Sequence, residues 1–186
     1  MKLKIAFGAL LAAFSLAACA PGVPPGTALV VNGHAYKVRL YDALLDNAKR
    51  ELLGSGVPVI SDPAYAAART RAEQAGALSI LARDAIVEQL AARRHVTVTQ
   101  TEIEARLAQL EQLAGGNGAL SRYIAARGLS PTDYRTFVRV QLLEERLSAG
   151  YSSTFPQVLA SAVRNASIQA YVGPCSDRHD YPACAG

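Results

Sequence analysis

The sequence has no tryptophan, and aromatic residues make up only 6% of its 186 residues. No aromatic or glycine-rich RNA-binding motif accompanies the basic residues, which are scattered along predicted helix faces. The formal net charge of +4 includes Lys2 and Lys4 of an expected export signal, and it falls to +2 without them. The composition therefore gives no support to nucleic-acid binding.

Motifs for catalysis are also missing. The three histidines, His34, His95 and His179, lie far apart, and no His-Glu-x-x-His motif is present. The segment Gly115-Gly116-Asn117-Gly118 lacks the lysine of a P-loop. Acidic residues that could be imagined as acid–base couples are more simply explained as solvated helix faces; they are Asp46, Glu51, Glu73, Asp84, Glu88, Glu102 and Glu104. We expect no enzyme activity, no cofactor and no bound metal ion.

Long apolar runs are limited to the amino terminus. Residues 1–18 resemble an export signal, with Lys2 and Lys4 before an apolar stretch that is too short to span a bilayer. The segment Leu16-Ala17-Ala18-Cys19 resembles the lipobox of bacterial lipoproteins, in which the cysteine is acylated and becomes the first mature residue. The alternative is an ordinary signal peptide in which Cys19 is incidental.

Residues 19–28 contain Pro21, Pro24 and Pro25, which suit a short extended tether between a lipid and a folded domain. Ala20 follows the cysteine where an aspartate would signal retention in the inner membrane. We expect the protein to be attached to a membrane through its lipid, with one domain on the extracytoplasmic side.

Cysteine is scarce, and besides Cys19 only Cys175 and Cys184 are present. In an exported protein such a pair predicts a disulfide, here closing the tail of residues 173–186. A metal site formed by Cys175, His179 and Cys184 is the alternative, although this spacing matches no common zinc module.

The longest helical pattern runs from Ala77 to Leu113. Its first apolar stripe consists of Leu78, Leu81, Ala85, Ile86 and Leu90. Thr99 and Glu102 then form a capping box that predicts the start of a second helix. Upstream, Ser61-Asp62-Pro63 is a helix start, so the first helix can run unbroken to Arg94. Gly76 would mark a bend in it or a close crossing by another segment.

Two short β-prone segments lie at opposite ends of the remaining chain. Residues 28–31 precede an Asn32-Gly33 turn, and residues 166–172 alternate between apolar and polar side chains. Because a lone strand cannot satisfy its backbone, we expect these two segments to pair. The predicted fold is mainly α, with residues 29–172 forming a multi-helix domain that contains this small β pairing.

The order of these elements resembles a known family. The resemblance rests on the Val31-Asn32-Gly33 strand, the long helix ending in Arg94-His95-Val96-Thr97-Val98-Thr99, the Glu102 helix, the Gly128-Leu129-Ser130 turn and the Tyr134 to Leu147 helix. Together they are similar to the amino-terminal chaperone region of SurA, PrsA and related extracytoplasmic foldases. The family commonly has glycine at the position of His95, and histidine can also take a left-handed conformation.

The resemblance implies a scaffold that binds unfolded polypeptides. In the family a parvulin-type prolyl isomerase domain usually follows the last helix, but only Ser148 to Thr154 separate Leu147 from the next helical segment here. The resemblance therefore implies a chaperone region without the isomerase.

We expect a lipid-anchored folding assistant that binds unfolded exported polypeptides in an apolar groove. Rings with polar tips suit such a groove, although they also pack in ordinary cores; the candidates are Tyr36, Tyr123, Tyr134 and Phe137. The alternative is a structural or adaptor lipoprotein that holds one dedicated partner in the cell envelope.

Overall fold

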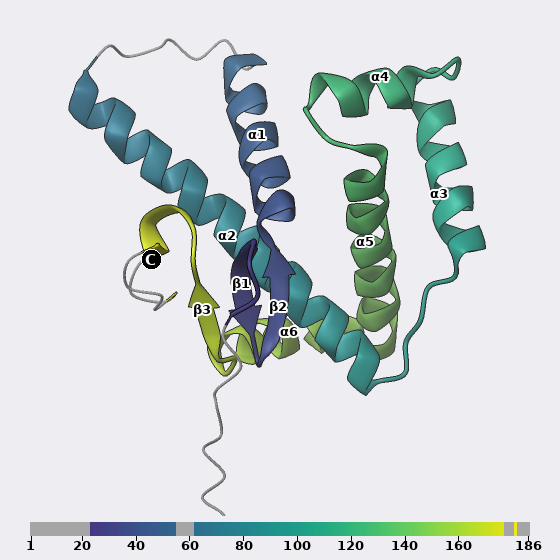
Figure 1. Ribbon diagram of the computed structural model, residues 1–186. Helices are drawn as coiled ribbons and strands as arrows, with labels where there is room; N and C mark the ends of the chain where they lie inside the picture. The colour runs from purple at the N-terminus through teal and green to yellow at the C-terminus, as the bar shows by residue number, and fades with distance from the viewer. Residues whose placement is uncertain (1–22, 55–61, 177–180, 182–186) are drawn as a thin grey trace, which may run out of the picture.

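The computed structural model describes residues 23–54, 62–176 and 181, and it is mainly helical with a small antiparallel sheet (Figure 1). The strands are β1 (Thr27–Val31), β2 (His34–Lys37) and β3 (Ile168–Ala170). The helices are α1 (Val38–Gly54), α2 (Pro63–Arg93), α3 (Gln100–Leu113), α4 (Ala119–Ala126), α5 (Pro131–Tyr151) and α6 (Phe155–Arg164). Short 3-10 turns, η1 (Ser152–Thr154) and η2 (Gly173–Cys175), follow α5 and β3. The predicted fold class is confirmed.

The sheet joins the two ends of the described domain. Its strand order is β2-β1-β3, and both pairings are antiparallel. Asn32 and Gly33 connect β1 to β2 with φ of 51° and 82°, as a two-residue hairpin requires. Leu29 pairs with Ala170, and both residues are fully buried. The predicted pairing of the first and last strands is therefore confirmed.

Helix α2 forms the centre of the core. It begins as predicted, because the Asp62 side chain accepts a hydrogen bond from the Ala64 amide at 2.8 Å and Pro63 follows. Its buried residues lie between Ala77 and Ala91, and they pack against the sheet, α1, α5 and α6. The prediction of a close crossing at Gly76 is wrong, since a Cβ added there would meet no atom within 4 Å.

The junction between α2 and α3 confirms the predicted local chemistry. His95 has a φ of 55°, in the left-handed region. The Thr99 amide donates to the Glu102 carboxylate at 2.8 Å, and the Glu102 amide donates to the Thr99 hydroxyl at 3.3 Å. The bond from the Thr99 amide is the largest cause of the lowered pKa of Glu102, and bonds from the Thr99 hydroxyl and from Arg146 add to it.

Helices α3, α4 and α5 form an arm, residues 100–151, that lies beside α1 in Figure 1. Ion pairs hold α3 to α5; they join Arg106 to Glu145, Arg135 to Glu104 and Arg146 to Glu102. Val140, Leu143 and Leu147 of α5 belong to the core and fix the arm to the rest of the domain. Helix α5 passes through η1 directly into α6, without an inserted domain.

The described part of the tail packs onto the core. Cys175 is fully buried and disulfide-bonded. Its predicted partner, Cys184, lies outside the described residues, as do Cys19 and His179. Gly173, with a φ of 59°, lies against the Tyr41 hydroxyl of α1. The described part of the tail therefore contributes to the main core.

Candidate functional site

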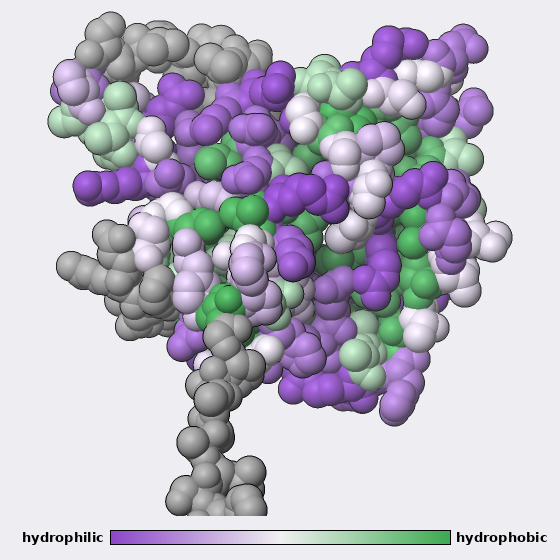
Figure 2. All heavy atoms as spheres, in the orientation of Figure 1, coloured by the Kyte–Doolittle hydropathy of each residue, from purple (hydrophilic) through white to green (hydrophobic). Residues whose placement is uncertain are grey.

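Three of the four predicted peptide-binding residues lie together. Tyr123 of α4 and Tyr134 and Phe137 of α5 line one small cleft of about 180 Å³, and Leu44 and Asn47 of α1 line its other side. Arg127 and Leu129 complete its wall. We call these seven residues the aromatic cleft. Hydrophobic side chains gather over and beside α4 among hydrophilic ones in the space-filling view (Figure 2).

Arg127 organises the mouth of the aromatic cleft. Its guanidinium carbon lies 4.7 Å from the centre of the Tyr123 ring. Its Nη1 donates a hydrogen bond to Asn47 Oδ1 at 2.9 Å. One side chain therefore joins α4 to α1 and also orients the most exposed ring of the cleft, through a cation–π contact.

The turn between α4 and α5 places the other two rings. Gly128 has a φ of 70°, which suits glycine, and Ser130 caps α5 by accepting from the Asp133 amide at 3.1 Å. Asp133 is buried and forms an ion pair with Arg39 of α1 at 2.9 Å. This pair is a second polar link between α1 and the arm, so the first turn of α5 is held where Tyr134 and Phe137 face α1.

Tyr134 connects the aromatic cleft to a neighbouring one. The second cleft, of about 350 Å³, lies between α3, α4 and α5 and is lined by Leu107, Leu120 and Ile124 among others. Burial raises the pKa of the Tyr134 hydroxyl, with a smaller contribution from Tyr123. The ring therefore stays neutral at physiological pH and presents apolar surface to both clefts.

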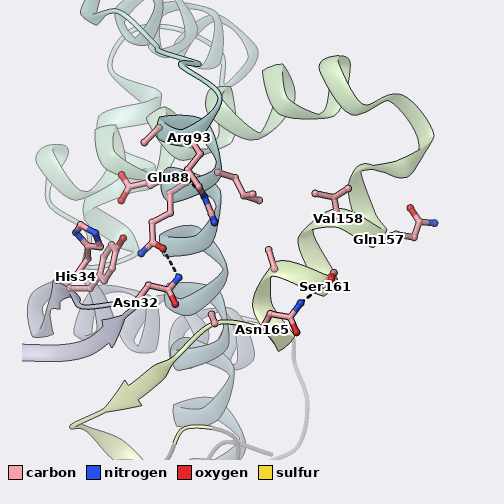
Figure 3. A pocket seen from close by; sticks show the side chains of 14 residues that line it. Asn32, His34, Glu88, Arg93, Gln157, Val158, Ser161 and Asn165 are labelled. Atoms are coloured by element: carbon pink, nitrogen blue, oxygen red, sulfur yellow. Dashed lines mark hydrogen bonds between the residues drawn. The ribbon is translucent and has the colours of Figure 1, made fainter.

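The fourth predicted residue, Tyr36, lies elsewhere. It lines a larger groove of about 960 Å³ between the β1–β2 hairpin, α2 and α6 (Figure 3). The Tyr36 hydroxyl donates to the Ala85 carbonyl at 3.4 Å, and burial is the main cause of its raised pKa. The structure thus separates Tyr36 from the other three aromatic residues.

Polar side chains in this groove mostly bond within the protein. Asn32 Nδ2 donates to Gln89 Oε1 at 2.7 Å, and Gln89 Nε2 donates to the Val31 carbonyl at 2.9 Å. Glu88 pairs with Arg139 of α5. Asn165, just after α6, donates to the hydroxyl of Ser161 of α6, as the dashed line in Figure 3 marks. The bonds of Gln89 fix the hairpin tip against α2, and Leu90 and Val158 belong to the groove lining.

Within the described part of the chain, no three His, Cys, Asp or Glu side chains converge on a metal position. His34 lines the groove beside β2, and His95 lies in the turn after α2. No helix among the described residues is long and apolar enough to cross a membrane.

Sequence reasoning missed the residues that complete the aromatic cleft. Leu44, Asn47, Arg127 and Leu129 come from separate elements, and no local motif connects them. Comparisons with protein-family models, with curated proteins and with solved structures find no match to this chain, so the site is interpreted from its own residues and geometry.

Proposed function

We propose that this protein is a lipid-anchored extracytoplasmic chaperone that binds unfolded exported polypeptides and has no prolyl isomerase activity. The observation that carries the proposal is the convergence of Tyr123, Tyr134 and Phe137 in one solvent-accessible cleft. Its rings and aliphatic walls suit an apolar client side chain, and Asn47 and Arg127 supply polar groups at the same place.

The size of the aromatic cleft suits weak and unselective binding. A cleft of about 180 Å³ has room for one client side chain. Burying one such side chain contributes about 1.5–3 kcal/mol, from which the costs of association and ordering are subtracted. Useful affinity then requires contacts at several places, such as the adjoining cleft beside Leu107 and Ile124. A chaperone that must release its clients needs this weak, distributed binding.

The element order supports the same proposal. The long α2, the left-handed turn at His95, the capped α3 and the direct passage from α5 to α6 agree with the chaperone region of SurA-like foldases without an inserted isomerase domain. An assay of proline-limited refolding tests the last point, and acceleration by catalytic amounts of the protein would contradict it.

The proposed anchor rests on the sequence of residues 1–28, in which Cys19, the residue proposed to be acylated, comes shortly before β1 at Thr27. The change Cys19→Ala is expected to release the mature protein from membranes or to block its processing. Intact-mass measurement checks this directly: an unmodified mature chain that begins at another residue would contradict the anchor.

The change Tyr123→Ser is expected to weaken suppression of client aggregation by about three- to tenfold, because it removes an exposed ring that clients contact. Tyr65→Ser is the matched control, since Tyr65 is 44% exposed and Tyr123 is 47% exposed, but Tyr65 lies on the first turn of α2. The measurement is light scattering of an unfolded exported protein, mixed with residues 23–186 of each variant. Circular dichroism confirms that each variant is folded.

If the Tyr123 and Tyr65 variants suppress client aggregation equally well, clients do not depend on the Tyr123 ring of the aromatic cleft for binding. No protection by the folded wild-type domain at several-fold excess would contradict the chaperone proposal. Saturable binding to one envelope protein in that case would favour the adaptor function instead.

A further inference from the structure

Strand β2 forms one edge of the sheet, because the strand order is β2-β1-β3. In Figure 1 it lies on the side of the sheet nearest α5. Val31 pairs with His34 across the two-residue hairpin, so these residues exchange backbone hydrogen bonds. Hydrogen-bonded and non-hydrogen-bonded pairs alternate along an antiparallel ladder. The N–H and C=O of Ala35 and the N–H of Lys37 therefore point away from β1.

No described strand or turn bonds to these outward backbone groups. Ala35 and Lys37 are both exposed, and no described element pairs with β2 on its outer side. The opposite edge differs, because Ala170 of β3 already has an interaction partner. A backbone donor and acceptor spaced as in a β-ladder are both satisfied by another extended polypeptide. The chemistry of this edge thus indicates its occupant.

Side chains of β2 add a second reason for an extended occupant. His34 and Tyr36 alternate with the outward-bonding residues and line the groove of about 960 Å³ between the hairpin, α2 and α6. A strand added beside β2 would place every second side chain on the same face as His34 and Tyr36. Those side chains would lie at the side of the groove that His34 and Tyr36 line.

We propose that an extended segment of an unfolded polypeptide adds to the sheet as a fourth strand along β2, and that its alternate side chains occupy the groove beside His34 and Tyr36. This inference rests on the proposed chaperone function and gives it a second binding mode. Backbone pairing depends little on client sequence, whereas the aromatic cleft selects apolar side chains. The two sites together explain how one small domain can hold clients of unrelated sequence.

The short length of β2 limits unwanted strand pairing between copies of the protein at this open edge. Only four residues form the strand, and Lys37 lies at its end. Short edges that carry lysine resist unwanted pairing between copies of a protein. A client held there would still be released readily, because few ladder bonds form.

The change Ala35→Pro tests the proposal. It removes the outward N–H and places the proline ring where the added strand would lie, but it leaves the bonds to β1 intact because Ala35 does not donate to β1. Ala35→Val is the matched control, since it keeps the N–H and suits a strand. We expect Ala35→Pro to weaken binding of a reduced, carboxymethylated polypeptide by about fivefold or more and Ala35→Val to bind like wild type.

Amide exchange of the wild-type domain gives an independent readout. Binding of the same polypeptide is expected to slow exchange at Ala35 and Lys37 and to leave His34 and Tyr36, which already bond to β1, nearly unchanged. This alternation is specific to an added strand and would not arise from a merely structural change.

The outcomes separate the two proposals. If Ala35→Pro binds as tightly as Ala35→Val, or if exchange at Ala35 and Lys37 does not slow, strand addition is overturned. The chaperone function stands in that case if Tyr123→Ser still weakens binding. If the folded wild-type domain does not bind the carboxymethylated polypeptide, both proposals are overturned.

Discussion

Replacing Asp84 with asparagine is expected to stabilise the protein by about 2–4 kcal/mol near pH 8 and by no more than about half of that near pH 5. Asp84 lies in the buried half of α2, and its side chain is only 17% exposed. Its only described ion pair is a long one, 3.8 Å to Arg83. Arg83 also pairs with Glu144 of α5, so the Asp84 carboxylate is poorly compensated.

The pH dependence follows from the direction of the pKa change. Burial raises the pKa of Asp84 from 3.8 to about 7; Arg83 opposes the rise, while Glu144 and Glu88 add to it. The folded protein holds this proton more tightly than the unfolded chain, so the free energy of unfolding falls as pH rises from 3.8 to about 7. Over this full pH interval the free energy of unfolding falls by about 4 kcal/mol, and partial solvation of the Asp84 side chain reduces that value.

Urea unfolding of wild type and Asp84→Asn near pH 5 and pH 8 measures this effect. Asp46→Asn is the matched control, because Asp46 is an exposed carboxylate on α1. The control is expected to leave the free energy of unfolding within about 0.5 kcal/mol of wild type at both pH values. If Asp84→Asn raises the free energy of unfolding by the same amount at both pH values, the Asp84 carboxylate is not the group that titrates.

Asp84 also marks where sequence reasoning was wrong. Its place among other charged residues predicted a solvated helix face, and Glu102 and Glu104 do lie on the ion-paired surface between α3 and α5. Asp84, however, is mostly buried. The helical period gives the direction of a side chain around its own helix, but which faces a second helix covers depends on tertiary packing.

Features set by neighbouring residues were predictable. The Thr99 and Glu102 capping box, the helix start at Asp62-Pro63 and the hairpin at Asn32-Gly33 each depend on a few adjacent side chains and backbone angles. The pairing of β1 with β3 was predictable for a different reason, because two isolated strands each needed a partner.

The candidate site was predictable only in part. Aromatic rings with polar tips identified Tyr123, Tyr134 and Phe137, but the same reasoning included Tyr36, which lies in a different groove. Which of these rings share a cleft depends on how α1 packs against the arm, and no local sequence pattern predicts that packing.

The change Ala170→Asp is expected to destabilise the whole domain by about 3 kcal/mol or more. Ala170 is fully buried opposite Leu29, at the contact that joins the last strand to the first. A carboxylate there must either remain charged among buried apolar side chains or bind a proton at high cost. Both outcomes reduce the free energy of unfolding. Gln169→Asp is the matched control, because residue 169 is exposed on the same strand. Its expected cost is within about 1 kcal/mol.

Far-UV circular dichroism during urea unfolding distinguishes a global effect from local fraying. The helices contribute nearly all of this signal, whereas β3 contains three residues. If β3 closes a single cooperative unit, Ala170→Asp moves the midpoint of the entire helical transition to lower urea, and Gln169→Asp leaves it nearly in place. An unchanged helical midpoint for Ala170→Asp would mean that β3 detaches alone. The helices would then hold the aromatic cleft together without the pairing of the two ends of the domain.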